Sequence, residues 1–148
     1  RQMCIRDRNK ILLAITAIFF ANTLSAATFE VEMLNRLGKE SMVYSQSVVN
    51  IQSGDTVKWL ATTKGHNVQF LSVPEGVGTF RSKLNVDTEY TFTVPGIYLY
   101  QCTPHKNMGM IAVVVVDGNK DNLNAITSAR VAGKSKQRLA KIIETLSS

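Results

Sequence analysis

Three side chains that can bind a soft metal ion lie close together in the C-terminal half of the chain. The thiol of Cys102 is followed by the imidazole of His105 and the thioether of Met110, with two and four residues between them. Thiolate and thioether ligands favour copper(I), and imidazole serves both oxidation states of copper. Two imidazoles, one thiolate and a weak axial thioether form the ligand set of a blue-copper electron-transfer site. The spacing therefore indicates a mononuclear copper site that needs one more histidine.

The second imidazole has a single source, because the chain contains two histidines. His66 follows a predicted strand over residues 55–60, so it can reach the metal from a separate loop. The candidate ligand set is therefore His66, Cys102, His105 and Met110. Met108 is an alternative source of the thioether.

Other chemistries for these residues are weaker alternatives. Structural zinc takes cysteine and histidine ligands, and methionine is not among its usual donors. A cysteine–histidine pair can form a catalytic nucleophile, but the methionine contributes nothing to that reaction. A multicopper oxidase needs more histidines, so we expect no enzyme activity. A copper-storage or chaperone role would use the same soft ligands, although exposed methionine or histidine clusters are not visible.

Short strands separated by turns must position these residues. The segments on either side of the copper loop are rich in β-forming residues, and Pro104 and Gly109 shape the connection between them. Seven or eight strands predict an all-β fold, a Greek-key sandwich of two sheets. We expect strands at residues 29–33, 41–44, 48–52, 55–60, 67–71, 89–94, 97–101 and 111–116.

The hydrophobic period changes after residue 116. Asp121 can cap a helix that runs through about Ala132 and ends at Gly133, and a second helix begins at about Ser135. The second helix carries an apolar stripe that we expect to pack on the sandwich, at Leu139, Ile142, Ile143 and Leu146. No aromatic residues are interleaved among the basic residues of this tail, which indicates a solvated face and no nucleic-acid partner. These residues are Arg130, Lys134, Lys136, Arg138 and Lys141.

Residues 1–26 have the basic, apolar and small-residue order of a cleaved secretory signal peptide. Their apolar run, residues 11–21, is too short to span a bilayer, and a buried core helix is the alternative interpretation. Cleavage before Ala27 or Thr28 leaves residues 27–148 as one domain, without membrane insertion. It removes four basic residues and one acidic residue, so the net charge of +6 falls to +3. It also removes Cys4, and metal ligation would protect the remaining cysteine in an oxidising compartment.

Several segments of the sequence resemble the cupredoxins, the blue-copper family, and among them the pseudoazurin group. The resemblance covers residues from about 27 to the C-terminus and is carried by residues 29–35, 53–57, 64–68, 90–96 and 102–110. It implies a soluble, monomeric, periplasmic carrier of single electrons with one copper ion. Its partners would be an upstream donor and denitrification reductases such as copper nitrite reductase. A carrier of the amicyanin or plastocyanin type for another redox chain is the alternative.

The resemblance also implies roles for individual residues. Met110 would be the axial ligand, His105 would be the solvent-facing ligand through which electrons leave, and Asn67 would hold the two ligand loops together. A small apolar docking surface would surround His105, with basic residues that steer an acidic partner. The resemblance places Met42, Lys64, Pro104, Lys106 and Met108 on this surface.

Overall fold

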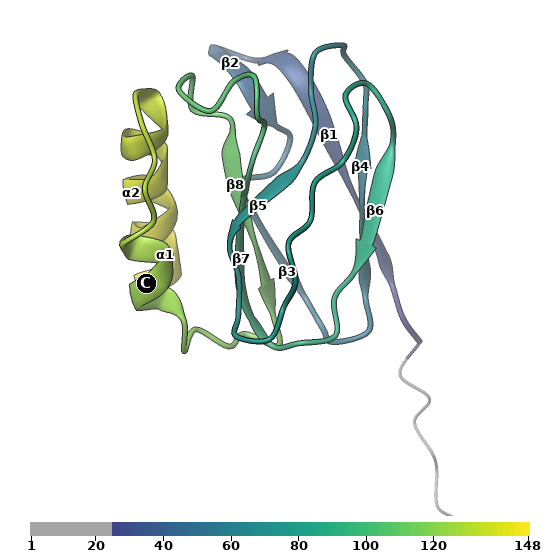
Figure 1. Cartoon of the computed structure of the whole chain (residues 1–148), viewed down its shortest axis with the longest axis vertical. Helices are drawn as coiled ribbons and strands as arrows, with labels where there is room; N and C mark the ends of the chain where they lie inside the picture. The colour runs from purple at the N-terminus through teal and green to yellow at the C-terminus, as the bar shows by residue number, and fades with distance from the viewer. Residues whose placement is uncertain (1–24) are drawn as a thin grey trace, which may run out of the picture.

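Eight strands form two four-stranded sheets that pack face to face, with two helices against one of them (Figure 1). The computed structural model describes residues 25–148, so the predicted leader lies outside the described residues except for its last two positions. The first sheet has the order β2 (Glu40–Tyr44), β1 (Thr28–Leu37), β4 (Thr56–Leu60) and β6 (Thr88–Thr91). The second has the order β3 (Val48–Ile51), β8 (Ile111–Val116), β7 (Gly96–Gln101) and β5 (Gln69–Ser72).

Both sheets are mixed, because β1 runs parallel to β4 and β3 runs parallel to β8, while the other pairs are antiparallel. The predicted all-β sandwich is therefore confirmed. Each predicted strand is present, with ends that differ by a few residues. None of the helices in residues 25–148 has the length and apolar character needed to cross a membrane.

The two strands beside the copper loop are buried on both faces, which explains why their sequences do not alternate between polar and apolar residues. One face of β7 and β8 packs into the sandwich through side chains such as Tyr98, Tyr100 and Val114. The other face packs against the helices through Leu99 and Val113, among others. Register and burial at this end of the sheet are thus fixed from two sides.

The core between the sheets reaches the predicted copper ligands. Trp59 is fully buried and makes an edge-to-face contact with Tyr100, with ring centroids 5.3 Å apart. Cys102 and Met110 belong to the same buried cluster. A ligand that lies in a packed core has little freedom to move, which is what a rigid metal centre requires.

The second predicted helix is confirmed as α2 (Lys134–Ser147), with Leu139, Ile142 and Leu146 buried. The first was predicted to run through about Ala132, which is wrong, because α1 (Leu123–Thr127) stops five residues earlier.

Helix α1 ends early because the chain is held in place on both sides of it, at Asn122 and at Lys134. Asn122 is tied to the start of β7, where its amide oxygen accepts from the N–H of Ile97 at 2.9 Å and its Nδ2 donates to the Ile97 carbonyl at 2.7 Å. The N–H of Lys134 donates to the carbonyl of Asn107, in the loop that follows the opposite end of β7. The residues between Asn122 and Lys134 must therefore cover the length of β7. An extended chain covers that length with fewer residues than a helix does.

Candidate metal centre

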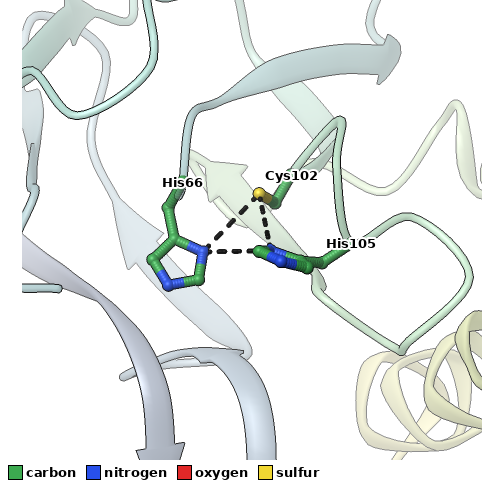
Figure 2. A group of neighbouring side chains, drawn as sticks. All are labelled: His66, Cys102 and His105. Atoms are coloured by element: carbon green, nitrogen blue, oxygen red, sulfur yellow. Dashed lines mark hydrogen bonds between the residues drawn. The ribbon is translucent and has the colours of Figure 1, made fainter. Parts of the chain in front are cut away.

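Two imidazoles and one thiol converge at one end of the sandwich (Figure 2). Nδ1 of His66 lies 3.2 Å from Nδ1 of His105, and Sγ of Cys102 lies 3.7 Å and 3.5 Å from these two nitrogens. The point equidistant from three atoms at such separations is about 2 Å from each, as imidazole and thiolate ligands require of a metal ion. The three side chains thus fit a single ion between them.

His66 comes from the loop between β4 and β5, and its orientation is set from behind. Its Nε2 lies 2.8 Å from Oδ1 of Asn35 and 3.1 Å from Oγ1 of Thr63. An Nε2–H that donates to Asn35 leaves the lone pair on Nδ1, which faces Cys102 and His105. Sequence reasoning assigned no role to Asn35 or Thr63. The only signal was that Asn35 ends the segment 29–35, which carried part of the resemblance.

The electrostatics of the centre favour neutral imidazoles. Burial lowers the pKa of His66, and the neighbouring His105 lowers it further. Burial also lowers the pKa of His105. Because only a neutral imidazole offers a lone pair to a metal, these shifts keep both rings in the binding form at neutral pH.

Cys102 is completely buried, and it forms no disulfide within residues 25–148. Burial raises the pKa of the Cys102 thiol, and backbone N–H groups of Asn67 and His105 partly oppose that shift. A bound cation would favour the thiolate, the form that serves as a metal ligand. A thiolate with two imidazoles forms part of the ligand set of a blue-copper site, and the thioether of Met110, in the same buried cluster as Cys102, would complete it.

The two methionines near the site differ in burial. Met110 is fully buried beside Cys102, whose N–H donates to the Met110 carbonyl at 2.9 Å. Met108 is 43% exposed. A solvent-exposed thioether is poorly placed to serve as a fixed axial ligand. The axial role of Met110 stays a prediction that this difference favours.

Asn67 joins the two ligand loops. Its Oδ1 accepts from the N–H of Thr103 at 2.8 Å, and its Nδ2 lies 3.1 Å from Oγ1 of Thr103. The backbone carbonyl of Asn67 accepts from the hydroxyl of Tyr44 at 2.8 Å. Asn67 is therefore bound on its side chain and its main chain, with His66 directly before it in the sequence.

The start of α2 also holds the copper loop, a contact that sequence reasoning missed. Oγ of the fully buried Ser135 donates to the Lys106 carbonyl at 2.5 Å, and the N–H of Lys134 donates to the Asn107 carbonyl at 2.9 Å. Gly133 has φ 58°, and a Cβ there would overlap the carbonyl oxygen of Asn107. No sequence pattern pairs residues 106–107 with 133–135, because the contact depends on how α2 packs.

The predicted docking residues are at or near this end. Pro104, Lys106 and Met108 are exposed on the copper loop, and His105 among them is half-buried, whereas His66 is fully buried. Lys64 is exposed. The adjacent Gly65 lies close to His105, because a Cβ added to Gly65 would be 3.7 Å from Cε1 of His105.

Met42 differs from the other four predicted docking residues. It is half-buried in β2, has a left-handed φ of 53°, and packs on the core cluster that contains Cys102 and Met110. The hollow that contains Met108 is lined by Ser41, the neighbour of Met42, but not by Met42 itself.

A two-sheet sandwich with a histidine–cysteine–histidine cluster on its end loops defines a cupredoxin, a small copper protein that carries electrons and is not an enzyme. A family model described as copper binding proteins of the plastocyanin/azurin family matches residues 31–117. A pseudoazurin of Paracoccus pantotrophus is 39% identical over 130 residues, which cover 86% of each chain. The chain belongs to this copper-binding family, on its pseudoazurin branch.

Solved structures agree with this assignment. A Sinorhizobium pseudoazurin superposes with a TM-score of 0.79 at 39% identity, over 82% of this chain and 98% of that one. The pseudoazurin of Methylobacterium extorquens AM1 gives a TM-score of 0.73 at 31% identity, over 81% of this chain and 97% of that one. The similarity thus extends over nearly all of the two solved chains and about four fifths of this one.

Proposed function

We propose that this protein is a periplasmic carrier of single electrons, with a type 1 copper site formed by His66, Cys102, His105 and Met110, that donates to a copper nitrite reductase. The observation that carries the proposal is the convergence of His66 Nδ1, Cys102 Sγ and His105 Nδ1 in a buried site. When bound, the ion supplies the one-electron couple between the cuprous and cupric states.

The protein's own residues supply rigidity and a route for the electron. Asn35 and Thr63 orient His66, and Asn67 holds the two loops together. A centre that keeps one geometry in both oxidation states loses little energy to rearrangement when an electron leaves. Of the two imidazoles, only that of His105 is partly exposed, so the electron leaves through His105.

The surface around His105 suits brief docking. Pro104 and Met108 offer apolar contact, and Lys64 and Lys106 add positive charge near the exit. Small interfaces of this kind are typical of transient redox complexes, and complementary charge accelerates encounter. A basic rim favours a reductase with an acidic docking face.

Burial argues against copper storage or delivery as the main function. His66 and Cys102 are completely inaccessible to solvent, so an acceptor protein could not take hold of either ligand without a large opening of the site. A protein that hands over its metal needs ligands that exchange with those of a partner.

Residues 1–26 belong to the same proposal as a secretory signal that directs the chain to the periplasm and is then removed. The mature chain begins at Ala27 or Thr28. Intact-mass measurement of protein isolated from the periplasmic fraction checks both points, and a retained leader would contradict them.

The proposal is tested by mixing the copper(I) protein with a copper nitrite reductase in a stopped-flow spectrometer. We expect the blue or green colour of the copper(II) protein to appear in a second-order reaction that slows as ionic strength rises. For comparison, the same measurement is made with a redox partner of an amicyanin-type carrier in place of the reductase. No electron transfer to the reductase, with rapid transfer to the other partner, would redirect the assignment to another redox chain.

A further inference from the structure

The lysines of α2 are exposed, as expected, but the basic residues line two separate hollows of the helix surface. Some of them border the copper loop. Lys134 and Arg138 lie against Gly109, where a Cβ would be 3.5 Å from Lys134 Cβ and 3.6 Å from Arg138 Nε. Figure 1 shows α2 beside the sheet that contains β7 and β8, with the connection from α1 leading back to its first turn. No pattern in the sequence indicates that these cations share a surface with Met108.

A groove of about 220 Å³ lies between the start of α2, the β1–β2 hairpin and the copper loop. We call it the α2 groove, and its lining includes Lys39, Glu40, Met108, Lys134, Arg138 and Lys141. A smaller hollow of about 100 Å³ shares Glu40, Arg138 and Lys141 with it and extends the basic surface along α2.

The charge in the α2 groove is unbalanced. Its one acidic residue, Glu40, is paired with Arg138 at 3.0 Å. Within residues 25–148, Lys39, Lys134 and Lys141 make no ion pair, and all three are exposed. The first turn of α2 contains no acidic residue, so the positive end of the helix dipole adds to the same potential. The groove thus has about three uncompensated positive charges at its rim.

We propose that the α2 groove receives an acidic surface segment of the redox partner and so fixes the orientation of docking beside His105. This inference rests on the proposed function as an electron carrier. Met108 belongs both to the groove and to the copper loop, so a segment that fills the groove lies against the loop that carries His105. Carboxylates on that segment would pair with the three free lysines. A second copy of this chain would bring like charges together, which disfavours self-association there.

The chain offers a matched control on the same helix. Lys136 lies on the other flank of α2, where it lines a different hollow with Thr127, Arg130 and Ala140. It is exposed, like Lys134 and Lys141. Lys136→Glu and Lys141→Glu therefore make the same change in net charge within one helix, but only Lys141 lines the α2 groove. An effect of net charge alone would be equal for both.

The first experiment needs no partner protein. ¹⁵N-labelled copper(I) protein is titrated with hexaglutamate at low ionic strength, and amide shifts are followed by NMR. We expect shifts at Lys39, Met108, Lys134 and Lys141, and an apparent Kd that rises about three- to tenfold in Lys141→Glu but less than twofold in Lys136→Glu. Equal losses in the two variants, or shifts confined to residues 64 and 106, would overturn the proposal.

Inorganic phosphate and anionic lipid vesicles serve as further arms of that titration. Phosphate that shifts the same amides as strongly as hexaglutamate does, at equal charge concentration, would mean a small-anion site. Vesicles that bind through the groove more tightly than hexaglutamate would mean a membrane contact. Either result would overturn the assignment to a protein segment, and weak binding in both arms supports it.

Stopped-flow transfer to copper nitrite reductase then separates this inference from the proposed function. We expect Lys141→Glu to lower the second-order rate about three- to tenfold and Lys136→Glu to leave it within twofold. Normal transfer with no effect of Lys141→Glu would reject the groove and keep the electron carrier. If the reductase accepts no electrons from the unaltered protein, the proposed partner is wrong. The hexaglutamate titration still tests whether the α2 groove binds an acidic segment.

Discussion

Asn67 and Thr103 are bound to each other by two hydrogen bonds, although they are 36 residues apart. The amide of Asn67 accepts from the Thr103 N–H and pairs with the Thr103 hydroxyl. Each residue directly follows a metal ligand, His66 or Cys102. The pair therefore holds the two ligand loops at a fixed separation.

Asn67→Ala should destabilise the protein and change its colour. The substitution leaves the partly buried N–H of Thr103 without its partner, and an unsatisfied buried donor typically costs about 1–3 kcal/mol. We expect that decrease in the free energy of unfolding of the apoprotein in urea, together with a shift in the visible bands of the copper(II) form. Asn124→Ala, at an exposed position in α1, is the control and should change neither. An unchanged spectrum in Asn67→Ala would show that the pair does not hold the ligands.

Cys102→Ser should abolish the intense visible colour of the copper(II) protein. That colour comes from charge transfer between the thiolate and copper, and a serine hydroxyl cannot replace the soft ligand. The visible absorption spectrum measures the outcome, and circular dichroism of the apoprotein checks that the sandwich still forms. An intense blue or green variant would exclude Cys102 as a ligand.

Met110→Gln and Met108→Gln together identify the axial ligand. Met110→Gln should keep the blue or green class of colour but lower the reduction potential, because an axial oxygen favours copper(II). Met108→Gln should leave spectrum and potential close to those of the original protein, since its side chain is 43% exposed. Potentials from protein-film voltammetry provide the comparison. The opposite pattern would assign the axial position to Met108.

Ser135→Ala should loosen the copper loop. Loss of the hydrogen bond to the Lys106 carbonyl costs about 1 kcal/mol of unfolding free energy and removes one restraint between His105 and Met110. Hydrogen exchange of the Met108 amide, which donates to the His105 carbonyl at 2.9 Å, should become faster in the copper(I) form. Ser147→Ala, whose hydroxyl donates to Ile143 in the same helix, is the control. Equal exchange in both variants would mean that α2 does not restrain the loop.

Charge reversal at Lys64 or Lys106 should slow transfer to an acidic reductase and flatten its dependence on salt. The two side chains flank His105, and the Debye length falls to about 10 Å at 0.1 M salt. Electron self-exchange should respond in the opposite direction, because two basic ends repel each other and added salt screens the repulsion. Stopped-flow and NMR line broadening measure the two rates. If the rates change neither with salt nor in these variants, the apolar contacts of Pro104 and Met108 alone govern recognition.

The sequence by itself determined the features that depend on local order. Alternation and turns predicted the strands, and the spacing of Cys102, His105 and Met110 indicated a copper loop. With two histidines in the chain, His66 was the one remaining imidazole that could complete the centre. These inferences succeeded because short segments carry their own periodicity and because a metal restricts the choice of ligand chemistry.

Only the tertiary structure decided which atoms meet. It placed Asn35 and Thr63 next to Nε2 of His66, so that Nδ1 faces Cys102. It also ended α1 early, because residues 122 and 134 are held at opposite ends of β7. It also placed the cations of α2 beside Met108. Apart from the contact of Thr63 with His66, these contacts join residues 25 or more apart in the sequence. They follow from how sheets and helices pack, which no local pattern records.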